Sequence, residues 1–309
     1  MPRIVKVVTT SFATLEDFAP PFNLRHPDPQ DNLRLGLGLL EAAGAQGADL
    51  ALLPEGFVAA GLPGTRLREV AQPYEGAAFR AVAEQARRHR MNVVAGFYAL
   101  EAGRMVNVAA LFDRGGRLVG TYAKKHPTEG EIGCGVTPGG ESRVVETDIG
   151  RIGLAICFDI NWQSLWSELK AKGAELVCWL SAYEGGLPLQ AHACLHQLRV
   201  VTSVWPYHAK IIEPTGRVVA QTSRWGRLAT AALDLDMRLF HTDGQSQHIL
   251  PIQARYGTRL KVETLTEEHI FTLSSADPGL EVAEVIAEYG LIELDAYLAR
   301  CTRAQEDAR

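Results

Sequence analysis

Apolar positions recur along the chain in two patterns, one of period two and one of helical period. The run RIVKVVTTSF, residues 3–12, predicts a first β-strand, and residues 48–57 predict a second strand that is apolar on both faces. Residues 31–46 predict a helix with Asp31 as its N-cap, because leucines recur there at helical spacing. The same reasoning predicts further elements: three strands within 92–127, strands at 151–158, 174–182, 199–206 and 227–236, a hairpin at 208–222, and helices at 76–89, 162–172 and 188–199.

The order of these elements predicts an α/β sandwich, in which sheet faces pack together and helices cover the outer faces. No internal repeat or linker divides the first part of the chain, so residues 1–240 are expected to form one domain. Residues 241–309 differ, because they predict a strand pair followed by two short helices. We expect this C-terminal extension to pack on the core or to lie at a subunit contact.

Composition and charge argue against nucleic acid or lipid as a partner. The 309 residues are 47% hydrophobic and 22% charged, and the net charge of −5 gives no attraction to polyanions. No segment approaches the roughly 20 apolar residues of a membrane-spanning helix, and the first residues do not resemble a signal peptide. A cytoplasmic protein is therefore expected.

The five cysteines are odd in number and show no CxxC spacing, so neither a disulfide framework nor a structural zinc site is expected. Cys178 and Cys194 fall within a predicted strand and a predicted helix, which is typical of core residues. Cys134 and Cys301 have no polar neighbours that would activate them. Cys157 differs, because it ends the apolar run of GRIGLAICF at a strand-to-helix turn, where backbone N–H groups can receive an oxyanion.

Two further charged positions follow predicted strands. Glu55 stands directly after the strand in LALLPEGF, at the end where open α/β sheets carry functional groups. Lys124 and Lys125 are neighbours on an extended segment, so one can face a site while the other faces solvent. Taken singly, each of these positions is better explained by an ordinary surface charge.

Histidines offer an alternative base for a cysteine nucleophile. His126, His192, His196 and His208 lie in the same half of the chain as Cys157, so a Cys/His hydrolase stays open on composition. The i, i+4 spacing of His192 and His196 suits zinc, but no HExxH pattern or third ligand accompanies it, and no metal is expected.

Three segments occur together in one order: LLPEGF, TYAKKHPTEGEI and GLAICFD. With the hairpin IIEPTGRVVAQT they resemble the nitrilase, or carbon–nitrogen hydrolase, superfamily over residues 3–237. The resemblance implies a four-layer αββα sandwich of two mixed sheets with helices outside. It also implies a Glu–Lys–Cys triad that needs neither a metal nor an organic cofactor.

The same resemblance assigns roles to residues of this chain. Glu55 is the expected general base and Cys157 the nucleophile, and the pattern Tyr-x-Lys-x-His selects Lys124 over its neighbour. A second glutamate is expected near the substrate, and the register of KKHPTEGEI selects Glu131, with Glu129 as the alternative. The chemistry is consistent, since a free cysteine is only a few per cent thiolate at neutral pH and needs a base.

Substrate contacts are expected on the same rim. The Phe158 backbone N–H would assist the oxyanion. Trp162, with Phe57 and Trp205, offers an apolar wall, although each taken singly is better explained by ordinary packing. Tyr183 and Glu184 follow the next strand, where the glutamate suits an amine. Asn161 stands where amino-acid amidases and carbamoylases often carry an arginine, which argues against an α-carboxylate substrate; alternatively it caps the following helix.

We therefore expect hydrolysis of a small amide or carbamoyl compound through a thioester, with release of ammonia or an amine. The segment CFD after the strand follows the amidase pattern and favours amide hydrolysis. The loop after Lys124 resembles nitrilases, so nitrilase activity is the alternative. At SVWP the chain departs from the Asn-Arg-x-Gly of many small-amide amidases, which argues against the omega-amidase type. A silent binding subunit is a further alternative, and a homodimer or higher homo-oligomer is expected from the resemblance.

Overall fold

A computed structural model describes residues 2–12, 18–19, 23–24 and 28–309 of the chain. Two compact units are present. One spans Lys6–Leu233, and the other joins the N-terminal residues as far as Val5 to Asp234–Arg309. No helix within the described residues combines the length and the apolar character that crossing a membrane requires.

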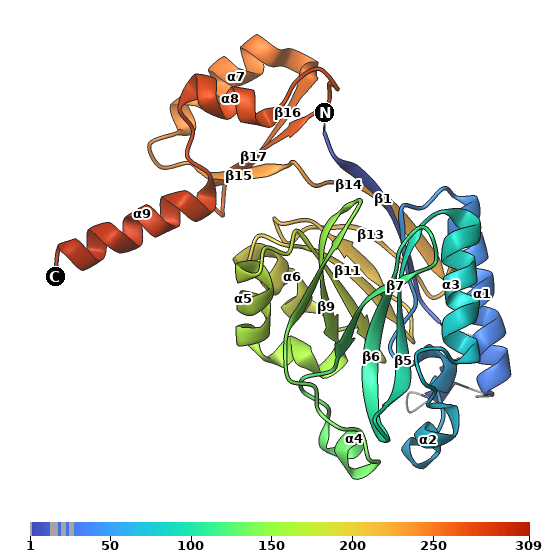
Figure 1. The fold of residues 1–309 in the computed structure, drawn as a ribbon. Helices are drawn as coiled ribbons and strands as arrows, with labels where there is room; N and C mark the ends of the chain where they lie inside the picture. Colours follow the sequence, from blue (N-terminus) through green and yellow to red (C-terminus); the bar gives the residue numbers. More distant parts are fainter. Residues whose placement is uncertain (1, 13–17, 20–22, 25–27) are drawn as a thin grey trace. The chain divides into compact units, whose positions relative to one another are not determined.

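The larger unit is built on two mixed sheets of six strands each (Figure 1). In spatial order the first sheet is β14 (Leu228–Asp234), β1 (Ile4–Thr10), β4 (Leu50–Leu52), β5 (Asn92–Glu101), β6 (Arg104–Phe112) and β7 (Leu118–Ala123). The second is β13 (Val218–Gln221), β12 (Lys210–Ile212), β11 (Arg199–Val204), β10 (Leu176–Ser181), β9 (Gly150–Ile156) and β8 (Arg143–Thr147). Strands β1, β4 and β5 are parallel in the first sheet, as are β9, β10 and β11 in the second, while β6, β7, β8, β12 and β13 join by antiparallel pairing.

The two sheets face each other and helices cover their outer sides, so the four-layer αββα sandwich is confirmed. Between the sheets, the Thr10 and Ser203 hydroxyl oxygens lie 3.0 Å apart, and the serine hydroxyl also donates to the Thr10 carbonyl at 2.8 Å. Helices α1 (Pro29–Ala45) and α3 (Ala77–His89) lie on the first sheet, and α5 (Gln163–Ala171) and α6 (Leu187–Leu195) on the second (Figure 1). Each predicted strand and helix of this unit is present, and β8 was not predicted.

The predicted start of the first helix was wrong. Helix α1 is capped by Asp28, whose side chain accepts hydrogen bonds from the backbone N–H groups of Gln30 and Asp31 at 2.9 and 3.0 Å. Pro29 then occupies the first helical position, where its missing N–H costs nothing. Asp31 therefore lies in the first turn and is not the N-cap.

Short elements complete the larger unit. They are β2 (Phe18–Ala19), β3 (Asn23–Leu24), α2 (Leu67–Val70), α4 (Glu129–Gly133) and the 3₁₀ turns η1 (Phe57–Ala59), η2 (Gly64–Arg66) and η3 (Cys157–Asn161). Of these, α4 falls in a stretch that was expected to be a glycine-rich loop.

The smaller unit has a three-stranded antiparallel sheet and its own apolar core. The predicted strand pair and two helices are present, while β15 and α7 were not predicted. Its core is lined by Phe240, Ile252, Phe271, Leu273 and Val285. Its elements are β15 (Arg238–His241), η4 (Ser246–His248), α7 (Ile249–Tyr256), η5 (Gly257–Arg259), β16 (Leu260–Leu265), β17 (Ile270–Ser275), α8 (Val282–Tyr289) and α9 (Leu294–Asp307), with sheet order β15-β17-β16. The expected role of this region at the core or at a subunit contact stays a prediction.

Candidate active site

The sequence-predicted site residues follow strands that end at one rim of the sandwich. Glu55 follows β4, Lys124 follows β7, and Cys157 follows β9. Strand β7 runs in the same direction as β4 and β5, because two antiparallel steps through β6 separate it from β5. The carboxyl ends of parallel strands share an edge of a sheet, so side chains distant in sequence meet there.

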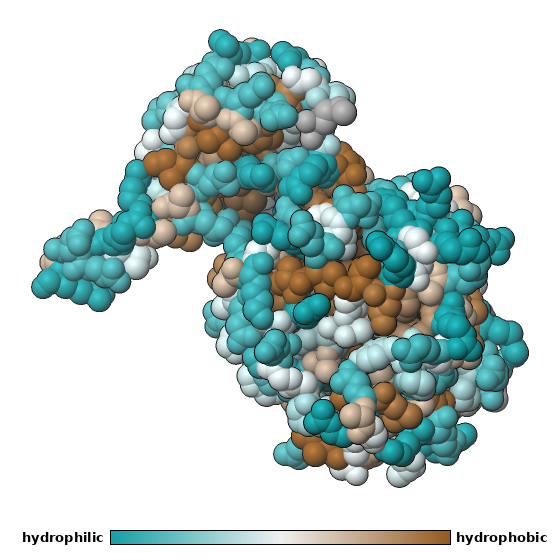
Figure 2. Space-filling view, viewed as in Figure 1, coloured by the Kyte–Doolittle hydropathy of each residue, from teal (hydrophilic) through white to brown (hydrophobic). Residues whose placement is uncertain are grey.

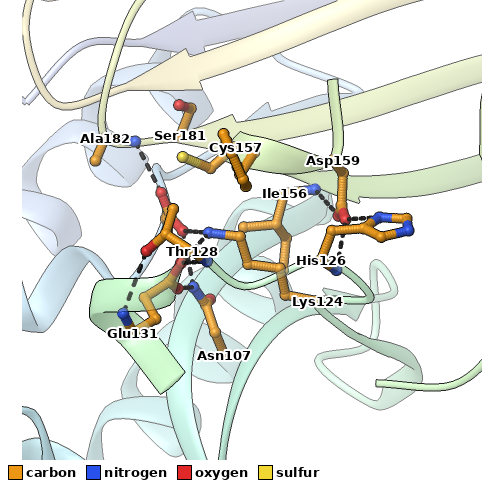
Figure 3. Close-up of polar contacts among 12 residues, drawn as sticks. Asn107, Lys124, His126, Thr128, Glu131, Ile156, Cys157, Asp159, Ser181 and Ala182 are labelled. Atoms are coloured by element: carbon orange, nitrogen blue, oxygen red, sulfur yellow. Dashed lines mark hydrogen bonds and ion pairs between the residues drawn. The ribbon is translucent and has the colours of Figure 1, made fainter. Parts of the chain in front are cut away.

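Lys124 lies between two carboxylates at the centre of the site (Figure 3). Its Nζ is 2.8 Å from Glu55 Oε1 and 2.7 Å from Glu131 Oε2. Asn107 Nδ2 donates to the same two side chains, at 2.7 Å to Glu55 Oε1 and 2.8 Å to Glu131 Oε1. Only 1% of Lys124 and 3% of Glu55 is exposed, so these charges compensate one another away from water. Glu129, the alternative to Glu131, is exposed.

A local capping motif orients Glu131. The Thr128 hydroxyl caps α4 by accepting the Glu131 N–H at 3.2 Å, and the glutamate side chain accepts the Thr128 N–H at 2.8 Å. This reciprocal arrangement is the capping box that a Thr-x-x-Glu sequence favours. It directs the carboxylate toward Lys124, whose neighbour Lys125 instead pairs with Glu168 at the surface, 3.1 Å away.

Burial and charge pairing oppose each other at this cluster. Burial disfavours the ammonium form of Lys124, but the negative charges of Glu55 and Glu131 oppose it, and the pKa of Lys124 is raised well above its usual value. Burial alone would raise the pKa of Glu131. The charge of Lys124 and hydrogen bonds from Lys124, Thr128 and Asn107 outweigh burial, so the pKa of Glu131 is lowered. The lysine is therefore positively charged and Glu131 negatively charged at neutral pH.

Cys157 occupies a strained turn directly after β9. Its φ of +48° lies in the left-handed region, which costs a non-glycine residue about 1–3 kcal/mol and is typical of functional sites. The Trp179 indole N–H donates to the Cys157 carbonyl at 3.0 Å and so holds this conformation. Burial and the charge of Glu55 raise the pKa of Cys157, while Lys124 and the Ser181 hydroxyl lower it less. The resting thiol is therefore protonated and needs a base.

Asp159, which the sequence analysis did not single out, connects the cysteine turn to the end of β7. It is fully buried, and its Oδ2 accepts the Ile156 N–H at 3.0 Å and the Tyr122 hydroxyl at 2.8 Å. Its Oδ1 accepts the backbone N–H of His126 at 3.0 Å and lies 2.8 Å from that residue's Nδ1 (Figure 3). The carboxylate thus joins the segment that carries Lys124 to the segment that carries Cys157.

The histidines have partners other than Cys157. His126 stacks on Trp162 with ring centroids 4.0 Å apart, in addition to its bond to Asp159. His192 stacks on Trp166 at 4.3 Å and its Nε2 lies 2.8 Å from the Ile160 carbonyl. His196 stacks on His192, and His208 packs edge-on to Tyr207. Within the described ranges, no group of three or more His, Cys, Asp or Glu side chains is placed to hold a metal.

Other predicted contact residues follow β9 and β10. Tyr183 is 39% exposed, its backbone N–H donates to the Ser181 hydroxyl at 3.0 Å, and burial is the main cause that raises its pKa to about 12. Glu184 follows it and is half-buried. Phe158 is 37% exposed at the cysteine turn, and Trp162 packs edge-on against it.

The structure decides two alternatives that the sequence left open at this rim. Asn161 does not cap α5, because the helix begins at Gln163 and the Asn161 amide instead donates to the Phe158 carbonyl at 3.0 Å. Phe57 is fully buried between Phe12 and Phe97, so it belongs to the core of the first sheet and lines no site.

The fold and the clustered carboxylates, lysine and cysteine define a hydrolase of the nitrilase type. The family model for carbon–nitrogen hydrolases matches residues 19–238, and the chain belongs to this family. It is thus an enzyme that acts on carbon–nitrogen bonds other than peptide bonds.

Two curated relatives agree with this assignment, and a solved structure shares the fold. A deaminated glutathione amidase of Bos taurus is 27% identical over 242 residues, covering 68% of this chain and 74% of that protein. A chloroplastic omega-amidase of Arabidopsis thaliana is 26% identical over 251 residues, covering 67% of this chain and 64% of that protein. An amidase from Nesterenkonia sp. has the same fold, with a TM-score of 0.65, 22% identity, and coverage of 75% and 91%.

Proposed function

We propose that the chain hydrolyses a small amide or carbamoyl compound, with Glu55 as general base, Lys124 as oxyanion stabiliser and Cys157 as nucleophile. The supporting observation is the buried lysine between two carboxylates, beside a cysteine in a left-handed turn. Because burial and the Glu55 charge keep the thiol protonated, the sulfur gains nucleophilicity only as a base removes its proton. Glu55 is the charged group positioned for that transfer.

In the first half-reaction the sulfur attacks the amide carbon while the Glu55 carboxylate takes the thiol proton. The carbonyl oxygen becomes an oxyanion. Two of the three N–H donors of Lys124 point to Glu55 and Glu131, and the third serves this oxyanion together with the Phe158 backbone N–H. The carbon–nitrogen bond then breaks, Glu55 returns the proton to the departing nitrogen, and ammonia or an amine leaves a thioester on Cys157.

In the second half-reaction water attacks the thioester carbon. Glu55 removes a proton from this water, and the Lys124 ammonium again stabilises the oxyanion. When the carbon–sulfur bond breaks, the acid is released and Glu55 returns the proton to the Cys157 sulfur. Glu131 and Asn107 hold the lysine in place throughout, because both form hydrogen bonds within the same cluster.

The relatives support amides as the substrate class, since both are named as amidases. Nitrile hydrolysis is the alternative, because the same thiol can add to a nitrile carbon. A catalytically silent chain would not need this set of buried charges, and the expected homo-oligomer stays a prediction that sedimentation velocity can test.

The decisive assay measures ammonia release from a panel of small amides, carbamoyl compounds and nitriles. Wild type is compared with C157A and with the matched control C178A, since Cys178 is a fully buried cysteine within β10. We expect turnover of at least one amide or carbamoyl compound by wild type and C178A, and none by C157A. Turnover of nitriles alone would favour the alternative, and turnover by C157A would overturn the proposal.

A covalent probe tests the nucleophile without knowledge of the substrate. A mutant of the Nesterenkonia sp. amidase carries the acetamide moiety of fluoroacetamide on its active site cysteine. In this chain the Cys157 sulfur should displace fluoride from the same reagent, and peptide mapping should find Cys157 modified ahead of the other four cysteines. Equal labelling of all five would favour a silent binding subunit.

A further inference from the structure

Trp205 links the main chain of Glu55 to the opposite sheet. It follows β11 of the second sheet, and its indole Nε1–H donates to the Glu55 carbonyl oxygen at 2.6 Å. Its own backbone N–H donates to the Ser181 carbonyl at 3.2 Å, at the end of β10. An indole can only donate a hydrogen bond, and the single N–H of Trp205 donates to the Glu55 carbonyl. The residue therefore joins the loop after β4 to β11 and to β10, the strand that pairs with β9.

The Glu55 loop needs such support, because Glu55 is the third residue after the end of β4. The Glu55 carboxylate is held at Oε1 by Lys124 and Asn107 and at Oε2 by the Ala182 N–H, 2.9 Å away. These bonds restrain the end of the side chain. The bond from Trp205 restrains the main chain from which that side chain extends.

Contact with the first sheet fixes the other side of this loop. A Cβ atom at Gly96 on β5 would lie 2.5 Å from the Pro54 carbonyl oxygen and 2.6 Å from Glu55 Cα. The loop thus rests directly on β5, and Trp205 approaches it from the second sheet. Between them these contacts set the position of Glu55 relative to Cys157, which the second sheet carries.

We propose that Trp205 is a positioning residue, whose indole N–H fixes the general base Glu55 against the Cys157 thiol across the two sheets. The inference rests on the proposed function, in which Glu55 accepts the thiol proton. Proton transfer requires the two groups to stay within hydrogen-bonding reach, and a displacement of 1 Å can cost about a hundredfold in rate. Loss of the indole donor also leaves the Glu55 carbonyl without this partner.

The test compares W205F with the matched control W166F. Trp166 is fully buried in α5, and its Nε1 has no acceptor among the described residues. W166F therefore replaces an indole by a smaller ring without removing a hydrogen bond. The rate of Cys157 alkylation by iodoacetamide and the kcat and KM for an amide are measured for both variants. We expect W205F to lower the alkylation rate and kcat together by about 10- to 100-fold with KM within about threefold, and W166F to leave both rates within about threefold.

A second substitution removes the N–H alone. Incorporation of 3-benzothienylalanine at position 205 replaces the indole N–H by sulfur in a ring of nearly equal shape, and it should reproduce the losses of W205F. Rates within about threefold of wild type for this variant would overturn the positioning role, as would equal losses in W205F and W166F. If W205F fails to fold, the rates of the 3-benzothienylalanine variant alone test the positioning role of Trp205.

The variant E55Q separates this inference from the proposed function. If E55Q slows alkylation of Cys157 and the position-205 variants do not, the role of Trp205 is wrong and the general base stands. If E55Q leaves the alkylation rate unchanged, Glu55 is not the base and the proposed function fails first.

Discussion

Replacing Lys124 by methionine removes the one ammonium that lies between the Glu55 and Glu131 carboxylates. Methionine is one atom shorter than lysine and similarly unbranched, and Lys124 is 1% exposed, so the change acts mainly by removing a buried charge. Nζ contacts the two carboxylates at 2.8 and 2.7 Å, and removing one partner from a buried ion pair costs about 3–5 kcal/mol. We expect K124M to lower the free energy of unfolding by about that amount at pH 7.

The neighbouring lysine provides a matched control. Lys125 pairs with Glu168 at 3.1 Å, with side chains 24% and 41% exposed, and a surface pair of this kind contributes about 0–1 kcal/mol. K125M should therefore change the free energy of unfolding by less than about 1 kcal/mol. The two adjacent Lys-to-Met substitutions should thus differ several-fold in the free energy of unfolding that they remove.

The loss in K124M should depend on pH in a defined direction. The folded-state pKa of Glu131 is lowered, so its charge contributes stability above the ordinary carboxyl pKa of about 4.3, and this contribution is lost as the pH falls through the lowered value. Without the ammonium, burial is expected to raise the pKa of Glu131 instead. The difference between wild type and K124M should therefore be largest near pH 7 and shrink in acid.

Urea titration followed by tryptophan fluorescence measures these changes. All five tryptophans lie within Lys6–Leu233, so their emission reports the larger unit. The kcat of K124M should fall by about 10²–10³ as well, since a transition-state donor is lost. Equal destabilisation of K124M and K125M, or a K124M stability within about 1 kcal/mol of wild type, would refute the account of the buried charges.

Two further substitutions test the supports of the site. G96A places a methyl group against the Glu55 backbone and should lower kcat by about a hundredfold, whereas G38A, whose Cβ meets nothing within 4 Å, should leave kcat unchanged in the same ammonia-release assay. D159N replaces an acceptor of four hydrogen bonds by an amide with one acceptor oxygen, so urea titration should show a loss of about 2–3 kcal/mol. A D159N protein as stable as wild type would contradict the connecting role of this carboxylate.

The parts of the site that could be predicted follow from strand geometry. Glu55, Lys124 and Cys157 each follow an apolar run, and the ends of parallel strands meet at one edge, so their convergence could be inferred. The alternation of side chains on an extended segment predicts that only one of Lys124 and Lys125 faces the site, and the family pattern selects Lys124. The family pattern then selected Glu131, which the structure places on the lysine.

Other contacts depend on pairings that leave no local signal. Asn107 sits within the apolar strand RMVNVAALF, and its partner Glu55 is 52 residues away, so its role emerges only when β5 lies between their strands. The bond from Trp205 to Glu55 spans 150 residues and two sheets. No periodicity in a single sequence encodes contacts of this kind.

Missed elements have more local causes. The Thr-x-x-Glu capping box of α4 was obscured by two glycines, which favour loops. Helix α7 contains Pro251, which indicates a break when met in sequence but is tolerated in the first turn of a helix. Asp28 was passed over as a cap in favour of Asp31 because the apolar periodicity begins after both residues.

The central claim is that turnover passes through a thioester on Cys157, and trapping that thioester tests it most directly. Wild type is mixed with an amide that it turns over, quenched in acid within the first turnover, and examined by intact-mass spectrometry and peptide mapping. The account predicts an acyl group on Cys157, with one ammonia released for each adduct formed. Ammonia release without an adduct at Cys157, or an adduct on a different cysteine, would contradict it.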